Sequence, residues 1–492
     1  MLSKLSRSSS VAPKFVRHFS KNVAHQKGAL ASSEVPLTTF YAATPSSQSN
    51  SVEEYLAKER ENLTNVKRTT LPNGVTVVSN DSVNKANSFV GLYVNAGSRF
   101  QTYQNDGVAH FVERFFYAGT NQRSMLRLVS DLQKTGASVS SQAGREDIVY
   151  QSESLREAVP QTLELIANSV LQGRLLDWDM PPKRKLVEAD VQSYGQDPEF
   201  VLGELLHQTA YEKRTLGRSL VCPPNQVDRI STANIIDYMN TLYTPSRITL
   251  VATNFNHDDL TILADRLFGY LDESQSAFAP LPSTANETAK YVGGSYEVNA
   301  VLDAPVNAQT QTIIGFEGVS VKDLKQYYAA NVLAQILGAG NNAYVGSLQR
   351  SEGLLQKNVV AKSQDVRHAR AFSISYSDSG LFGVYVQAKN GSTASNAVLA
   401  SVDSIKNAAE QITDAQLSSA KNQILVNFAS GLESPRGFNE FNAKFQDQSS
   451  HFDAIKKLTV ADVRQVAKQI VQSKPTLVSA GNLDGILTVK DL

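Results

Sequence analysis

The side chains best suited to chemistry lie in one short segment, Asn105 to Thr120. His110, Glu113 and Arg114 are three and four residues apart there, so a helix would carry an imidazole, a carboxylate and a guanidinium on one face. Groups of the first two types can bind a metal or move a proton. The alternative is a polar stripe on a surface helix, because a histidine and a glutamate at this spacing form a motif of low specificity.

The flanking residues predict that this segment is a helix packed on a core. Asn105 or Asp106 can cap its start, and Gly119 can end it in the left-handed conformation. Apolar residues recur at the spacing of a buried helix face, namely Val108, Phe111, Val112, Phe115 and Phe116.

Other elements follow from periodicity and turn signals. In the first half we expect strands at 75–78, 89–94, 143–154 and 248–253, and helices at 105–118, 123–136, 156–172, 181–193, 198–212, 232–243 and 257–271. In the second half we expect strands at 312–316, 371–376, 381–388 and 475–482, a helix at 322–338, and two helices after residue 388.

The two halves end alike. Ile230 to Ala252 and Leu458 to Ala480 both consist of a capped helix, a proline and an apolar strand. We therefore predict an α+β fold made of two similar, duplicated α+β domains, each a mainly antiparallel sheet with helices. The predicted boundaries are 1–33 for a leader, 34–60 for an extended arm, 61–272 for the first domain, 273–295 for a proline-containing linker and 296–492 for the second domain.

Composition excludes several classes of protein. Lysine plus arginine and aspartate plus glutamate both number 47, so no basic excess points to nucleic acid. The single cysteine, Cys222, excludes an internal disulfide framework and a cysteine-ligated cluster. The apolar runs are shorter than the roughly 20 residues of a spanning helix, so we expect membrane association only through partner proteins.

The first 33 residues differ from the rest. They contain basic residues and serines but no acidic residue, a composition typical of a mitochondrial transit peptide. Arg17-His18-Phe19-Ser20 suggests cleavage after Phe19. A disordered basic tail is the alternative.

The helix and several distant segments together resemble the pitrilysin and insulin-degrading-enzyme family of inverted zinc peptidases, whose helix carries H-x-x-E-H. The matching segments are Leu71–Gly74, Asn95–Arg99, Gly107–Phe111, Ala118–Thr120, Gly136–Ala137, Arg145–Glu146, Thr215–Arg218 and Tyr376–Gly383. In that family the two histidines and a later glutamate bind zinc, and the glutamate of the motif is the general base.

The resemblance implies that the metal site is broken. His110 matches the first histidine and Glu113 the general base, but Arg114 replaces the second histidine. Asp190 stands at the ligand glutamate and Lys183 at a supporting glutamate. Because a guanidinium cannot act as a ligand and repels a cation, we expect no metal, no cofactor and no peptidase activity. We further expect Arg114, helped by Lys183, to replace the charge of zinc and to join the two helices.

Within this family, the broken site is consistent with a non-catalytic, matrix-side core subunit of respiratory complex III (ubiquinol–cytochrome c reductase), attached peripherally to the mitochondrial inner membrane. Its expected partners are a second core protein and the cytochrome subunits. The alternative is a subunit of the mitochondrial processing peptidase, either catalytic or non-catalytic. Retention of His110 and Glu113 suggests descent from a catalytic branch.

Two further motifs are interpreted as structural features and not as binding sites. The loop Gly338 to Gly346 follows a helix and lacks the phosphate-binding lysine, so a helix end and turn is favoured over a nucleotide site. His368, between Arg367 and Arg370, is read as a solvated strand edge.

Overall fold

The computed structural model describes residues 65–81, 87–272, 287–298, 309–339, 353–445 and 450–491. The chain divides into two compact units, Met1–Tyr55 and Leu56–Leu492, and all described residues belong to the second. The predicted leader and arm, most of the predicted linker and the loop after residue 339 lie outside the described residues.

The first half contains a six-stranded mixed sheet. Its strands are β1 (Lys67–Thr70), β2 (Thr76–Asn80), β3 (Asn87–Val94), β4 (Ser138–Ala143), β5 (Ile148–Leu155) and β6 (Ile248–Thr253). They lie in the order β1-β2-β6-β3-β5-β4, and only β2 and β6 are parallel. β4 is therefore an edge strand.

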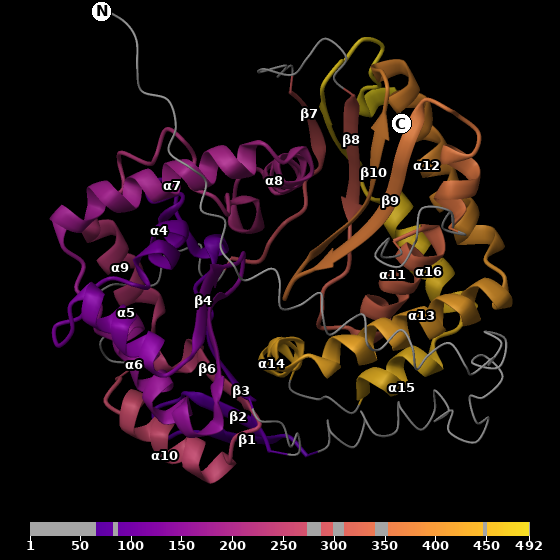
Figure 1. Cartoon of the computed structure of the whole chain (residues 1–492). Helices are drawn as coiled ribbons and strands as arrows, with labels where there is room; N and C mark the ends of the chain where they lie inside the picture. The colour runs from indigo at the N-terminus through magenta and orange to yellow at the C-terminus, as the bar shows by residue number, and fades with distance from the viewer. Residues whose placement is uncertain are drawn as a thin grey trace, which may run out of the picture. The chain divides into compact units, whose positions relative to one another are not determined.

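The second half repeats this arrangement with five strands (Figure 1). They are β7 (Gly294–Val298), β8 (Thr310–Glu317), β9 (Val366–Ser375), β10 (Gly380–Ala388) and β11 (Thr476–Ala480). Their order is β7-β11-β8-β10-β9, with β7 and β11 as the parallel pair. Each strand from β7 to β11 thus has a counterpart in the first sheet, which confirms the predicted duplicated α+β fold.

Helices surround both sheets. Those of the first half are α4 (Val108–Phe115), α5 (Met125–Lys134), α6 (Val159–Leu171), α7 (Met180–Gly195), α8 (Pro198–Ala210), α9 (Thr232–Leu242) and α10 (His257–Phe268). Those of the second half are α11 (Leu324–Leu337), α12 (Gly391–Gln411), α13 (Asp414–Glu433), α14 (Pro435–Lys444), α15 (Ser450–Lys457) and α16 (Val460–Gln472). None of the helices in these described ranges is both long and apolar enough to span a membrane.

Local sequence explains why equivalent helices begin at equivalent places. α9 and α16 both start with a capping box, Ser231 with Asn234 and Thr459 with Asp462. α8 and α14 both start with proline after a polar cap residue.

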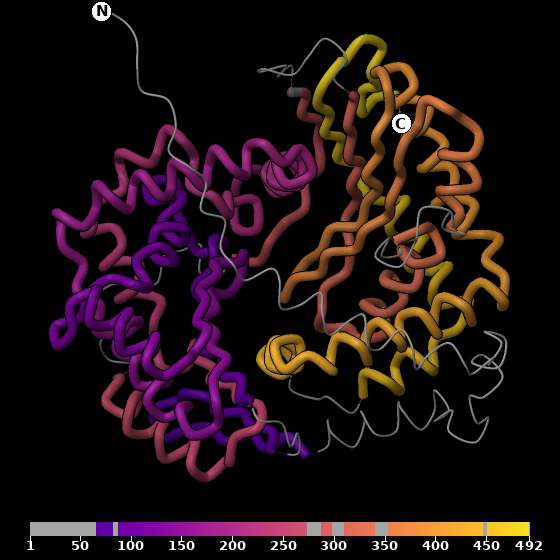
Figure 2. Tube along the Cα trace, in the orientation of Figure 1, coloured from indigo at the N-terminus to yellow at the C-terminus, as the bar shows by residue number. Residues whose placement is uncertain are grey.

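One helix of each half packs on the sheet of the other half (Figures 1 and 2). α8 packs on β7, β8 and β11, and its buried Leu206 belongs to a core cluster with Ile313 and Val478. α14 packs on β3 and β6, where the amide nitrogen of Asn439 donates a hydrogen bond of 3.0 Å to the carbonyl oxygen of Phe89. The two halves therefore share their cores.

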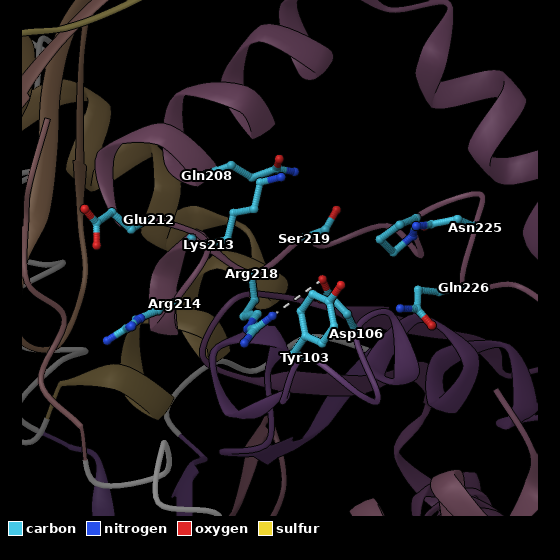
Figure 3. A pocket seen from close by; sticks show the side chains of 12 residues that line it. Tyr103, Asp106, Gln208, Glu212, Lys213, Arg214, Arg218, Ser219, Asn225 and Gln226 are labelled. Carbon is cyan, nitrogen blue, oxygen red and sulfur yellow. Dashed lines mark ion pairs between the residues drawn. The ribbon is translucent and has the colours of Figure 1, made fainter. Parts of the chain in front are cut away.

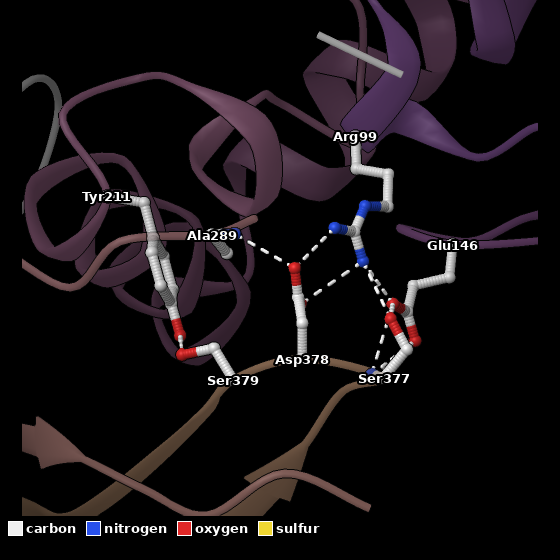
Figure 4. A network of polar contacts seen from close by, with 7 residues as sticks. All are labelled: Arg99, Glu146, Tyr211, Ala289, Ser377, Asp378 and Ser379. Atoms are coloured by element: carbon white, nitrogen blue, oxygen red, sulfur yellow. Dashed lines mark hydrogen bonds and ion pairs between the residues drawn. The ribbon is translucent and has the colours of Figure 1, made fainter. Parts of the chain in front are cut away.

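A polar network also joins the halves (Figure 4). The guanidinium of Arg99 contacts Glu146 at 2.5 Å and, from the second half, Asp378 at 2.7 Å. The backbone amide of Ala289 donates to the same Asp378 carboxylate at 2.8 Å. This network holds the turn between β9 and β10 against the first half.

Several details differ from the sequence prediction. The single strand expected at 143–154 is a hairpin, in which β4 and β5 flank a turn at 144–147. Five helices, rather than two, lie between β10 and β11 in the described residues. β7 begins at Gly294, inside the predicted linker.

Candidate functional site: a degenerate metal site

Helix α4 carries the motif, but it begins and ends differently from the prediction. Its N-cap is Gly107, with φ of 94°, and no side chain caps it. Asn105 instead accepts a hydrogen bond of 2.6 Å from the amide of Thr102. The helix ends at Phe115, before Gly119. The predicted caps are therefore wrong.

Gly107 is required by close packing as well as by its backbone angle. A Cβ atom at this position would lie 2.5 Å from Sγ and 2.6 Å from Cα of Cys222. The loop that contains Cys222 thus rests directly on the start of α4. The five apolar residues predicted to face the core, Val108, Phe111, Val112, Phe115 and Phe116, are all buried as expected.

Helix α7 brings the second part of the site to α4. Oδ2 of Asp190 lies 3.2 Å from Nε2 of His110 and 2.6 Å from Nε of Arg114. The Nε–H of Arg114 is not directed at this oxygen, so the contact is an ion pair rather than a well-aligned hydrogen bond. Nη2 of Arg114 lies 3.8 Å from Oε1 of Glu113. Arg114 thus contacts both carboxylates of the site.

The tautomer of His110 follows from its other contact. Its Nδ1 accepts a hydrogen bond of 3.3 Å from the backbone amide of Cys222. Burial lowers the pKa of His110, which favours the neutral ring. A neutral ring that accepts at Nδ1 carries its proton on Nε2, the nitrogen that faces Asp190. This nitrogen therefore donates to Asp190 and has no lone pair free for a metal.

Glu113 is held by the edge strand of the sheet. Its Oε2 accepts a hydrogen bond of 2.8 Å from the backbone amide of Ala143 on β4. Burial raises the pKa of Glu113, while this hydrogen bond and the charge of Arg114 oppose the rise. The Glu113 carboxylate is thus held by a backbone donor of β4 and lies near the guanidinium of Arg114.

Lys183 has a different place from the one expected. Its ammonium nitrogen donates a hydrogen bond of 2.6 Å to the carbonyl oxygen of Arg114 and lies 5.7 Å from the ring centre of Phe115. It forms no ion pair with Glu113 or Asp190 among the described residues. Lys183 therefore joins α7 to the end of α4, and Arg114 is the cation that contacts the carboxylates.

The residues present do not fit a zinc ion. A catalytic zinc site needs three protein ligands and an open position. Here only His110 and Asp190 have ligand chemistry at the ligand positions, and the guanidinium of Arg114 lies against the oxygen that would have to bind metal. Within the parts of the chain that the structure describes, no three side chains of histidine, cysteine, aspartate or glutamate are grouped to hold a metal.

The duplicated α+β fold and the helix with the sequence H-x-x-E-R are those of a zinc-peptidase-like protein. Two family models match the chain, insulinase (peptidase family M16) over residues 76–224 and the peptidase M16 inactive domain over residues 229–424. Together they match more than half of its length. The chain belongs to peptidase family M16.

Individual relatives are subunits of mitochondrial-processing peptidases. The chain is 27% identical to the probable subunit alpha of Schizosaccharomyces pombe, over 86% of this chain and 87% of that protein. It is 28% identical to subunit alpha of Solanum tuberosum, over 84% of this chain and 82% of that protein. It is also 27% identical to the probable subunit beta of Schizosaccharomyces pombe, over 85% of this chain and 92% of that protein.

These relatives correct the expected partners. A second core protein and the cytochrome subunits of complex III are wrong as partners, because the similar proteins are named as subunits alpha and beta of one peptidase. The expectation rested on the broken ligand set. The loss of metal ligands indicates that a chain cannot perform metal-dependent catalysis. It gives no information about the surfaces that bind other proteins.

Proposed function

We propose that this chain is a non-catalytic M16 subunit of a mitochondrial assembly of the processing-peptidase type, in which it pairs with a second M16 chain. The proposal includes import through the basic leader at 1–33 and the domain limits predicted above. The proposal does not require a partner protein in the membrane.

The position of Arg114 is the observation that supports a non-catalytic role. Arg114 stands where the family has its second histidine, and its Nε lies 2.6 Å from Oδ2 of Asp190, at the ligand carboxylate. A guanidinium stays protonated at any physiological pH, so this position supplies positive charge and no lone pair. Without a metal, water keeps its ordinary pKa, and Glu113 has no activated nucleophile to deprotonate.

The partner follows from the relatives. The identity to subunit alpha and to subunit beta of the same yeast is 27% in both cases, and each match covers most of both proteins. A chain that is equally similar to two subunits of one enzyme, but lacks its ligand set, fits the role of a scaffold for a catalytic relative.

The test is purification of the tagged chain from gently solubilised mitochondria, followed by mass spectrometry, metal analysis and cleavage of a presequence peptide. We expect one other M16 chain, with an intact H-x-x-E-H motif, to co-purify. The zinc in the purified complex should be bound to that partner. Cleavage of the presequence peptide should persist when Glu113→Gln is introduced into this chain, and the equivalent change in the partner should abolish it.

Two results would overturn the proposal. One is stoichiometric zinc in the isolated chain together with cleavage that Glu113→Gln abolishes. The other is co-purification of haem-containing membrane proteins without any processing-peptidase subunit.

A further inference from the structure

A second polar site lies away from the degenerate metal site, in a pocket of about 420 Å³ (Figure 3). Three segments form its walls: the last turn of α8 with the loop after it, the turn that precedes α4, and residues 217–226. Its charged lining residues are three cations, Lys213, Arg214 and Arg218, and two acids, Asp106 and Glu212. The lining therefore has a cationic excess.

Arg218 is the unusual member of this set. It is only 9% exposed, yet its guanidinium donates no hydrogen bond to any residue within the described ranges. Its nearest carboxylate oxygen, Oδ2 of Asp106, is 3.8 Å from Nη1, which is beyond hydrogen-bond distance. Buried arginines normally have hydrogen-bonded anionic partners, because an unsatisfied buried charge is costly.

The terminal nitrogens of Arg218 are the part that can reach a ligand. Nε is buried and has no hydrogen-bond partner in the part of the chain that the structure describes, whereas Nη1 and Nη2 are not among the buried atoms that lack partners. In Figure 3 the guanidinium lies beside Asp106 and Tyr103 in the centre of the lining residues. A guanidinium that presents its end in this way can hold an oxyanion with two parallel hydrogen bonds.

Asp106 forms a long ion pair with Arg218, at 3.8 Å, and does not satisfy its hydrogen-bonding capacity. Within the described ranges its Oδ1 atom is buried without a hydrogen bond. Burial raises the pKa of Asp106, while the charges of Arg218 and Lys213 and the backbone of Ser219 oppose the rise. Asp106 and Glu212 together supply two negative charges against three positive ones, so the lining keeps a cationic excess that an anion could balance.

Backbone strain fixes the loop that supplies Lys213. Glu212, Lys213 and Thr215 have φ values of 50°, 57° and 44°, which is unusual for residues with side chains. Such strain persists only where the surrounding structure enforces it, and it is frequent at binding sites. Lys213 consequently lines the pocket instead of continuing helix α8.

We propose that this pocket binds a small polar ligand with a phosphate or carboxylate group, held by the terminal guanidinium nitrogens of Arg218 and the ammonium group of Lys213. The amides of Gln208 and Gln226, which line the same pocket, would contact the rest of the ligand. This site is independent of the proposed function, since it uses none of the residues at the zinc position.

The test is isothermal titration calorimetry of the purified full chain with inorganic phosphate, and separately with succinate, at an ionic strength held constant with potassium chloride. We expect saturable binding of at least one of the two. Binding of phosphate alone or of succinate alone identifies the group that the site prefers.

Matched variants locate the site. Lys213→Gln and Arg214→Gln remove the same charge from adjacent exposed residues. In Figure 3 the side chain of Lys213 extends toward Gln208 on the pocket wall, whereas that of Arg214 extends away from Gln208, Arg218 and Asp106. Lys213→Gln should weaken binding about tenfold, the effect of one charge-assisted hydrogen bond, and Arg214→Gln should change it little. Arg218→Lys keeps the charge but loses the paired geometry, and it should weaken binding by a similar factor.

Absence of saturable binding of both anions would overturn the proposal. So would binding that Lys213→Gln and Arg218→Lys leave unchanged, because the anion would then occupy another place. A heat signal that potassium chloride alone reproduces would reflect ionic screening, and it would also overturn the proposal.

Discussion

Nε of Arg114 lies 2.6 Å from Oδ2 of Asp190, an oxygen that is also 3.2 Å from Nε2 of His110. A single carboxylate oxygen therefore accepts a hydrogen bond from the imidazole of His110 and forms an ion pair with the guanidinium of Arg114. The contact closes the position at which a divalent ion would have to enter.

Restoring the family's residues should restore metal binding. We expect the double variant Arg114→His, Asp190→Glu to retain about one zinc per chain after dialysis, because it supplies three ligands of the correct types. Arg114→Gln is the matched control, since it removes the guanidinium without adding a ligand. Metal analysis by mass spectrometry decides: equal zinc in the control and the double variant would show that the charge of Arg114, not the missing ligand, excludes the metal.

Removing Arg114 should make stability depend more strongly on pH. Arg114→Met leaves Glu113 and Asp190 without the cation between them, at an expected cost of about 1–3 kcal/mol at pH 7. Burial holds the pKa of Glu113 above its usual value, so the charged carboxylate destabilises the folded state at neutral pH. This destabilisation disappears as the pH falls below the pKa of Glu113 in the folded protein, because the carboxylate is then protonated.

The difference in unfolding free energy between wild type and Arg114→Met should therefore be largest near neutral pH and shrink in acid. Urea unfolding at a series of pH values measures it. Arg127→Met, which removes a 65% exposed arginine paired with Asp131, serves as control and should cost little. A loss of stability that is constant with pH would show that Arg114 acts through packing alone.

The network at Arg99 should contribute strongly to stability. Arg99 and Asp378 have side chains only 8% and 10% exposed, so Arg99→Met leaves two carboxylates without their common cation. The expected loss is about 3–5 kcal/mol. Arg156→Met breaks a surface pair with Asp81, in which both side chains are more than two-fifths exposed, and should cost less than about 1 kcal/mol. Similar urea midpoints for the two variants would refute the importance of this network.

Gly107 should tolerate no side chain. Gly107→Ala places a methyl group 2.5 Å from Sγ of Cys222 at a φ of 94°, and we expect a loss of about 2–4 kcal/mol from overpacking and strain. Gly136→Ala has a φ of 65° but nothing within 4 Å of the added atom, so it should cost only about 1 kcal/mol. Thermal unfolding of both variants separates the steric effect from the backbone effect.

Much of the fold was accessible from the sequence because its signals are local. The capped helices near 232 and 460 and the apolar strands after them follow from short patterns that the duplication repeats. The hairpin of β4 and β5 was missed because Ser138–Ala143 is mostly polar and its turn, Gly144 to Asp147, lacks the usual turn dipeptides.

The site was accessible only in part. The resemblance identified His110, Glu113, Arg114 and Asp190, and the structure brings these four together. The donors that fix them, the amides of Cys222 and Ala143, are backbone groups, which residue types do not reveal. Lys183 was misplaced for a related reason, since a lysine can reach a carbonyl as readily as a carboxylate.

The exchange of α8 and α14 between the two sheets limits how the chain can be divided. A fragment that stops before α14 would leave a face of β3 and β6 uncovered, and a fragment that starts after α8 would do the same to β8 and β11. Since an exposed apolar sheet face favours aggregation, we expect that neither repeat folds stably on its own. We therefore expect the two repeats to unfold together in one cooperative transition.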